Sequence, residues 1–226
     1  MFNPEKHKSV MVRILKDIYS DTLLGKMLGF KGGTMAYLFY ELPRESVDLD
    51  FDLLDKNNEA QVFNKIKSLL EKHGKLLECI VKKNTLFYLL DYGYTERKLK
   101  IEITRKKTET NFVVMNYLGI SMLVMNRSAM VAGKLLALAT RVKFANRDVF
   151  DTWFFLKNGW EIDEEVIKNK SEMGIDKIIK KAILRVEKIK DNEILHGLGE
   201  LLSNSMKDFV RFHLKEDVLL ELRMRL

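Results

Sequence analysis

This chain of 226 residues has few of the residues that mark several common classes of protein. Its single cysteine, Cys79, excludes an internal disulfide and a cysteine-based zinc cluster, and its apolar neighbours predict a buried thiol. The four histidines are scattered without metal-ligand spacing, and two prolines, Pro4 and Pro43, leave no proline-rich linker. No apolar run is long enough to span a bilayer, and the N-terminus lacks a signal-peptide core. We therefore expect a cytoplasmic protein with no membrane partner.

The composition is that of a folded globular protein with an excess of positive charge. Hydrophobic residues make up 46% of the chain and charged residues 31%, which argues against wholesale disorder. Lysine and arginine number 39 against 32 aspartate and glutamate residues, a net charge of +7. This excess favours polyanionic partners without identifying one.

The periodicity of the apolar residues changes once, near residue 126. Before it, the pattern predicts helices at 10–24, 35–40 and 57–73, and strands at 47–52, 76–81, 85–91, 98–104 and 112–125, the last interrupted at Gly119. After it, the period stays helical to the C-terminus, beginning with a helix that Ser128 is predicted to cap. The sequence therefore predicts an α+β fold, with a small mixed β-sheet and flanking helices in residues 1–126 and a helical region in residues 127–226.

The stretch from residue 30 to residue 52 has the most distinctive pattern of the chain. Gly32, Gly33 and Thr34 separate an apolar run from a helix-like run, which is typical of a strand-to-helix turn whose backbone N–H groups can meet an anion. In the strand that follows, Asp48 and Asp50 alternate with apolar residues and therefore share one face. Acidic residues in this pattern can hold a divalent metal against a polyphosphate. Taken alone, each half is more often an ordinary turn or a solvated strand edge.

A third carboxylate depends on how the strands pair. In the strand at 98–104, Lys100, Glu102 and Thr104 point away from the apolar face. If this strand lies beside the one at 47–52, Glu102 comes close to Asp48 and Asp50. The alternative is an amphipathic strand with a solvated glutamate.

Two segments together resemble the signature of the AbiEii-type nucleotidyltransferases, the toxins of abortive-infection toxin–antitoxin systems within the polymerase-beta-like superfamily. The first runs from Gly32-Gly33-Thr34 to Pro43-Arg44-Glu45-Ser46-Val47-Asp48-Leu49-Asp50-Phe51, and the second from Lys134 through Arg147-Asp148 to Asp151. The resemblance implies a nucleotidyltransferase core in residues 1–126, and in residues 127–226 a helical region that completes the nucleotide site and binds the acceptor.

The resemblance also implies roles for individual residues. Asp48, Asp50 and Glu102 would hold Mg²⁺ or Mn²⁺, and Lys134 and Asp148 would join them as catalytic residues. The implied nucleotide-binding residues are Gly32, Gly33, Thr34, Arg44, Ser46, Lys134, Arg147 and Asp151. Without the resemblance, Lys134 is more simply interpreted as a lysine whose ammonium group reaches solvent. Arg147 and Asp151 are then an ordinary i,i+4 ion pair on one helix. The third acid departs from the superfamily, where an aspartate is usual, and the chain is short for the family.

The activity implied is transfer of a nucleoside monophosphate from an NTP to an acceptor, with the tRNA 3′ end favoured and a cognate antitoxin as a further partner. A basic helix face supports a nucleic-acid acceptor, with Lys177, Lys180, Lys181, Arg185 and Lys188 opposite an isoleucine stripe. The alternatives are AMP transfer to a protein by the same site, a non-catalytic nucleic-acid-binding relative, and a solvated lysine face that serves only solubility.

Overall fold

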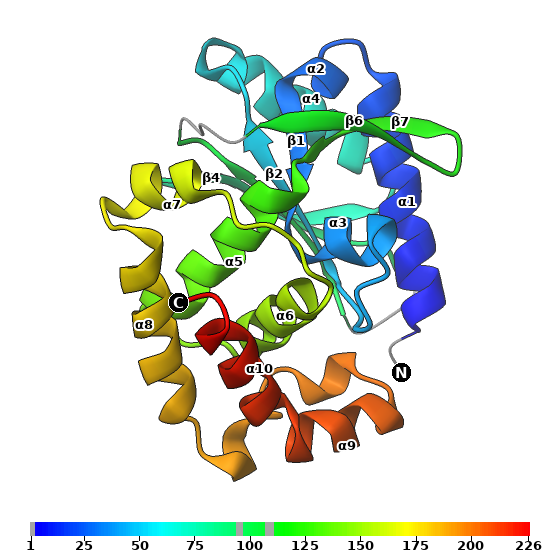
Figure 1. Cartoon of the computed structure of the whole chain (residues 1–226). Coiled ribbons are helices and arrows are strands. Elements are labelled where there is room, and N and C mark those ends of the chain that lie inside the picture. Colours follow the sequence, from blue (N-terminus) through cyan, green and yellow to red (C-terminus); the bar gives the residue numbers. More distant parts are fainter. Residues whose placement is uncertain (1–2, 94–96, 107–110) are drawn as a thin grey trace. The chain divides into compact units, whose positions relative to one another are not determined.

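The computed structural model describes residues 3–93, 97–106 and 111–226, which form two compact units (Figure 1). The first unit comprises Met1–Glu41, Glu45–Thr108 and Phe112–Met125. The second comprises Leu42–Arg44, Glu109–Asn111 and Asn126–Leu226. Arg44 therefore belongs to the second unit, in a three-residue segment whose flanking segments belong to the first.

A seven-stranded mixed sheet forms the centre of the first unit. Its strands are β1 (Leu28–Lys31), β2 (Asp48–Leu53), β3 (Lys75–Val81), β4 (Thr85–Asp91), β5 (Leu99–Thr104), β6 (Phe112–Tyr117) and β7 (Ile120–Met125), in the order β3-β4-β5-β2-β1-β7-β6. β2 runs parallel to β5 and β1 parallel to β7, while the other neighbours are antiparallel. The sheet confirms the predicted fold class. The interrupted strand is a hairpin that turns at Leu118 and Gly119, both with positive φ.

Helices of the first unit pack against this sheet. They are α1 (Pro4–Ser20), α2 (Leu24–Met27), α3 (Gly32–Phe39) and α4 (Glu59–Leu70), with a 3₁₀ turn at Lys56–Asn58. α1 begins before the predicted start because the Asn3 side chain accepts a hydrogen bond from the Lys6 N–H, 3.0 Å away, and Pro4 occupies the first turn. α3 contacts β1 and β2, and α4 contacts β3 and β4.

Alternation along the strands decides which side chains enter the core. Leu49, Phe51, Ile101 and Ile103 are completely buried on one face of β2 and β5. The expectation that Cys79 is buried is wrong, because this residue is half-buried on β3, a strand with a neighbour on one side only. The intervening polar residues of β2 and β5 share the opposite face, which carries the candidate site.

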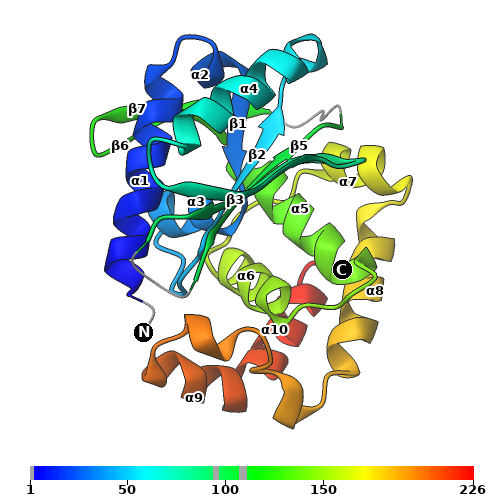
Figure 2. The same ribbon diagram turned by 180° about the vertical axis from the view of Figure 1, so that it is seen from behind.

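The second unit is helical. Its helices are α5 (Arg127–Thr140), α6 (Asn146–Lys157), α7 (Glu164–Ser171), α8 (Ile175–Glu187), α9 (Asn204–Phe212) and α10 (Leu214–Arg223), with 3₁₀ turns at Asp191–Glu193 and Gly199–Leu201. α5 packs on α6 and α8, and α10 packs on the same two helices (Figures 1 and 2). The predicted Ser128 cap is wrong, because Asn126 is the N-cap and accepts the Ser128 N–H at 3.0 Å. None of the described helices is long and apolar enough to cross a membrane.

Candidate active site

The polar face of β2 and β5 gathers three of the predicted site residues. The parallel register sets Asp50 opposite Glu102 and Asp48 opposite Lys100. This pairing brings Glu102 beside the two aspartates, as the sequence requires for a three-carboxylate site. We call Asp48, Asp50, Glu102 and Lys100 the acidic face.

Lys100 is the cation at the centre of the acidic face. Its Nζ lies 3.0 Å from Asp48 Oδ2 and 3.8 Å from Glu102 Oε2. Burial alone would lower the pKa of Lys100, but the Asp48 and Glu102 carboxylates outweigh burial and raise that pKa. Sequence reasoning missed this contact, although Lys100 points the same way as Glu102 and could have been predicted to meet the acids once the strands were paired.

Asp50 lies against the glycine turn at the start of α3. Gly32 has φ of +84°, and a Cβ built there would lie 2.5 Å from Asp50 Oδ2. Only glycine therefore suits both the backbone conformation and the space that the carboxylate occupies. Burial, followed by the neighbouring Asp48 carboxylate, raises the pKa of Asp50, although Lys31 and Lys100 oppose the shift. Asp50 is thus a half-buried acid that a nearby cation would stabilise in its charged form.

Thr34 and Ser46 fasten the start of α3 to the start of β2. The Thr34 hydroxyl lies 2.9 Å from Ser46 Oγ and also hydrogen-bonds the backbone carbonyl of Asp48. Both side chains are buried, so in this structure they position the strand that carries Asp48 and Asp50. Gly33 is the second residue of α3, and no side chain caps this helix. The N–H groups of its first turn thus have no side-chain acceptor at the cap.

A third aspartate on the same strand face is already neutralised. The Lys31 ammonium pairs with Asp52 and donates to Thr104 Oγ1 at 2.8 Å, and Asp52 is buried. Alternation along β2 places Asp52 on the same face as Asp48 and Asp50, but Asp52 is paired with Lys31. The acidic face therefore carries three carboxylates and one ammonium group, that of Lys100.

The donor chemistry of the acidic face suits a divalent metal. Carboxylate oxygens are the ligands that Mg²⁺ and Mn²⁺ prefer, and the net charge of the face is negative. In the part of the chain that the structure describes, however, no three histidine, cysteine or acidic side chains form a metal-ligand cluster. Lys100 contacts two of the three carboxylates, so a metal would have to displace its ammonium. The three carboxylates fit the metal in chemistry, and the Lys100 ammonium now contacts two of them.

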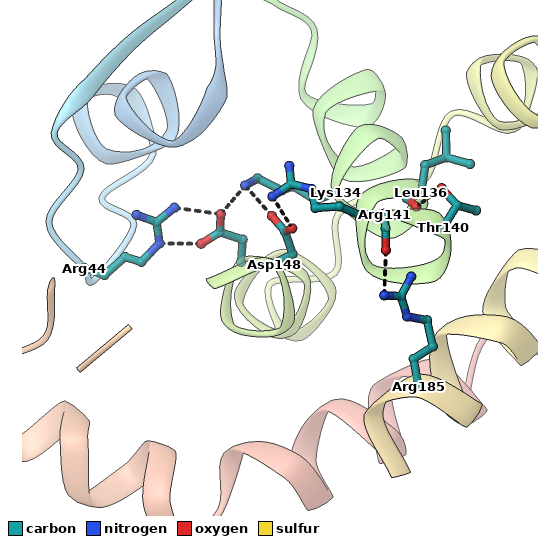
Figure 3. Close-up of polar contacts among 8 residues, drawn as sticks. Arg44, Lys134, Leu136, Thr140, Arg141, Asp148 and Arg185 are labelled. Atoms are coloured by element: carbon teal, nitrogen blue, oxygen red, sulfur yellow. Dashed lines mark hydrogen bonds and ion pairs between the residues drawn. The ribbon is translucent and has the colours of Figure 1, made fainter. Parts of the chain in front are cut away.

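Four of the remaining predicted residues meet in an ion-pair network within the second unit, which Figure 3 shows. We define this network as Arg44, Lys134, Arg141, Asp148 and Asp151. The Arg44 guanidinium binds Asp151 through two N–H groups at 2.6 and 2.7 Å. Lys134 Nζ lies 2.7 Å from Asp151 Oδ2 and 3.1 Å from Asp148 Oδ1. Arg141 Nη1 lies 2.9 Å from Asp148 Oδ2, in a poorly directed contact that leaves this oxygen without a regular hydrogen bond.

Asp151 is the centre of this network. Its side chain is fully buried and the Arg44 side chain is 3% exposed. Burial would raise the pKa of Asp151, but the Arg44 and Lys134 charges outweigh it and lower that pKa to about 2. A buried carboxylate with two cationic partners is stabilising only while all three are present.

Lys134 therefore has structural partners, where the sequence led us to expect a phosphate instead. An ammonium group has three N–H donors, and two of them serve Asp148 and Asp151. The third donor is available for an anion, and the Lys134 side chain is 17% exposed. Arg147 is half-buried on α6 and lies outside the network. Arg141 belongs to it although sequence reasoning did not select this residue, because the partner of a helix-terminal arginine depends on how two helices pack.

The chain matches a known family over most of its length. The family described as nucleotidyl transferase AbiEii toxin, type IV TA system, matches residues 13–219. No curated protein matches the chain significantly. Among solved structures, the fold is similar to MenT4, a nucleotidyltransferase toxin from Mycobacterium tuberculosis, at 16% identity and a TM-score of 0.60, covering 96% of this chain and 82% of that one.

Two further structures share the fold. JHP933 from Helicobacter pylori is 19% identical with a TM-score of 0.56, covering 98% of this chain and 94% of that one. An antigenic nucleotidyltransferase-like protein from Paracoccidioides brasiliensis is 15% identical with a TM-score of 0.50, covering 89% of this chain and 96% of that one. At such low identity these structures establish the fold alone.

Proposed function

The chain belongs to the AbiEii family of nucleotidyltransferase toxins, and we propose that it transfers a nucleoside monophosphate from an NTP to RNA, with the tRNA 3′ end as the favoured acceptor. The acceptor hydroxyl oxygen forms a bond to the α-phosphorus while the bond to pyrophosphate breaks. Pyrophosphate leaves with that electron pair, and the hydroxyl proton passes to solvent. The type IV toxin–antitoxin classification of the family implies an antitoxin partner.

The acidic face is the observation that carries this proposal. Asp48, Asp50 and Glu102 are side by side on two parallel strands, next to a glycine turn that leaves room for the Asp50 carboxylate. These residues would hold Mg²⁺, or Mn²⁺, which nucleotidyltransferases generally use. When bound, such an ion neutralises negative charge that develops on the transferred phosphate and the leaving group. Lys100 would release the carboxylates as the ion enters.

Other residues would bind the NTP. The uncapped N–H groups at Gly32, Gly33 and Thr34 offer donors to a phosphate, while Thr34 and Ser46 position β2. We propose that Lys134 contacts a phosphate through its third N–H. Asp148 and Asp151 hold that ammonium in place, and Arg44 in turn orients Asp151. Arg147 stays a prediction from the family resemblance alone.

The basic face of α8 supports an RNA acceptor. Lys177 and Lys180 of the helix and Lys188, directly after it, are exposed, while Lys181 and Arg185 are half-buried. The buried face of the same helix carries Ile178, Ile179 and Ile183. Lysines segregated in this way can neutralise several phosphates of one strand without disturbing the helical core.

A transfer assay with separate acceptors tests the proposal. The full chain is incubated with each α-³²P-labelled NTP, Mg²⁺ and total tRNA, and the products are resolved as RNA and as protein. We expect label in RNA, dependent on divalent metal and on Asp48. Label confined to protein would replace the RNA acceptor with a protein acceptor. Absence of transfer with every NTP, from folded protein that binds RNA, would favour the non-catalytic relative.

The chain supplies a matched control for the acidic face. Asp91 is an aspartate of β4, in the same sheet, and pairs with Lys98 at 2.7 Å. The Asp91→Asn variant removes an equal charge without touching the proposed site and should retain full transfer. Equal losses in Asp48→Asn and Asp91→Asn would point to general damage of the sheet.

A further inference from the structure

A cavity in the second unit lies beside the segment that carries Asp148. It has a volume of about 600 Å³ and is lined by the loop between α5 and α6, the C-terminal part of α8 and the segment that follows. This volume is within the range of small-molecule sites, which is roughly 300–1,000 Å³. The lining combines an aromatic ring, Phe144, with two cations, Arg185 and Lys188, and a buried amide, Asn146.

The buried amide has one unused polar atom. Asn146 is 8% exposed, and its Nδ2 donates to the backbone carbonyls of Glu193 at 2.7 Å and His196 at 3.2 Å. These two bonds use both N–H donors and fix which end of the amide is Oδ1. Within the described residues Oδ1 has no donor, yet it is not among the buried polar atoms sealed without a partner. Asn146 lines the cavity, so Oδ1, which is not sealed from solvent, is an oriented acceptor of a lining residue.

A preorganised cation lies beside the ring. The Arg185 guanidinium is 5.1 Å from the centre of the Phe144 ring, and its Nη2 donates to the backbone carbonyl of Arg141 at 2.7 Å (Figure 3). A guanidinium has five N–H donors, so several remain for an anion. The acid of the lining, Glu193, lies 3.9 Å from Lys190, which offsets its charge. The cavity is therefore net positive, with Arg185 held in place before a ligand arrives.

We propose that this cavity binds one nucleotide. The nucleobase would lie against Phe144, its exocyclic or ring N–H would donate to Asn146 Oδ1, and its phosphate would meet Arg185 and Lys188. An aromatic ring, an amide acceptor and a fixed guanidinium are the groups with which proteins hold an unstacked base and its phosphate. The inference rests on the proposed function, because that function supplies two sources of the nucleotide: the RNA acceptor and the NTP.

Binding measurements without metal distinguish these sources and do not depend on transfer activity. The full chain is titrated with a fluorescein-labelled single-stranded oligoribonucleotide by anisotropy, and with each unlabelled NTP by calorimetry. Phe144→Leu keeps an apolar side chain but removes the ring. We expect this variant to bind the nucleotide about ten-fold more weakly than the wild type, as is typical for loss of one stacked base. Because stacking involves no counterion release, this loss should be the same at low and high salt.

Val142→Ala is the matched control, since Val142 is in the same loop, fully exposed, and outside the lining. We expect the affinities of Val142→Ala for RNA and NTPs to equal those of the wild type. The two variants should also have the same thermal stability, so that a difference in affinity is not a difference in folding. Weakened RNA binding in Phe144→Leu alone identifies the acceptor as the source, and weakened NTP binding identifies the substrate. Unchanged affinity of Phe144→Leu for RNA and for every NTP overturns the nucleotide site, whereas failure of the proposed function would leave binding intact and abolish transfer only.

Discussion

Two charged clusters of this protein use the same side chains in opposite ways. The acidic face of the first unit leaves Asp48, Glu102 and Lys100 between 23% and 33% exposed, with three carboxylates against one ammonium. The ion-pair network of the second unit buries Asp148 and Asp151 almost completely and surrounds them with Arg44, Lys134 and Arg141.

The difference separates a site that can accept a cation from one that already has its cations. Removing a carboxylate from the acidic face relieves repulsion, because Asp48 raises the pKa of Asp50. Removing a carboxylate from the network leaves buried positive charges without partners, which is costly. We therefore expect substitutions in the acidic face to affect transfer, and substitutions in the network to affect stability, with Lys134 as the network member that also has a proposed phosphate contact. Variants at four positions test this expectation.

Asp50→Asn should give the largest effect, on transfer alone. It removes a charged ligand while keeping the shape of the side chain, so we expect loss of transfer by at least about 1,000-fold, roughly 4 kcal/mol. The thermal midpoint should stay equal to that of the wild type or rise, because a repelled charge disappears. Full transfer by folded Asp50→Asn would refute the acidic face as the active site.

Asp151→Asn should mainly affect stability. We expect a loss of about 3–5 kcal/mol in the free energy of unfolding, measured in urea at pH 7, because Arg44 and Lys134 lose their shared buried carboxylate. A loss no larger than that of Asp91→Asn, whose ion pair with Lys98 is more exposed, would contradict this role.

The pH dependence of that loss gives a second measurement on the same variant. The pKa of Asp151 is lowered to about 2 in the folded protein, whereas an unfolded aspartate titrates near 4. Its stabilisation is therefore fully present above about pH 4 and disappears as the pH falls towards about 2. The difference between wild type and Asp151→Asn should narrow by about 2.6 kcal/mol over this interval. A difference that stays constant down to pH 2 would mean that packing, rather than charge, is lost.

Lys134→Ala tests whether a member of the network also serves catalysis. If its third N–H meets a phosphate, kcat/KM for the NTP should fall. The loss should correspond to about 2–4 kcal/mol of transition-state stabilisation, as for one preorganised charge-stabilising donor. Arg141→Ala is the control, because Arg141 also pairs with Asp148 but is 41% exposed and has no proposed phosphate contact. We expect its kcat/KM to change less than about three-fold. Equal losses in the two variants would show that Lys134 acts through the network only.

Lys100→Met should give the smallest effect, in the opposite direction. Removing the internal cation leaves the acidic face more negative, so Mn²⁺ binding, followed by the electron paramagnetic resonance of free Mn²⁺, should tighten. A partly exposed ion pair is worth up to about 1 kcal/mol, which corresponds to about five-fold in affinity. Lys98→Met, on a lysine that pairs with Asp91, should leave affinity unchanged. Weaker Mn²⁺ binding in Lys100→Met would show that the ammonium orders the ligands rather than competing for them.

The sequence by itself determined the fold class and the common strand face of Asp48 and Asp50. Alternation in the segment at 47–52 is a local property, because successive side chains of a strand point to opposite sides whatever the strand pairs with. The requirement for glycine at the turn from β1 to α3 is local as well, since the backbone of Gly32 has positive φ. Pairing of β2 with β5 was stated only as a condition, because register between strands far apart in sequence depends on long-range contacts.

Only the tertiary structure decided the partners of the charges. Arg44 and Asp151 are 107 residues apart, and no local pattern predicts their bidentate contact. The same holds for Lys100 between Asp48 and Glu102, and for Lys134 between two aspartates. Helical periodicity indicates that Lys134 interrupts an apolar face, but an ammonium there can meet a phosphate, solvent or a carboxylate with equal local justification. Its partner is set by how α5 packs on α6, which depends on the shapes of many side chains at once.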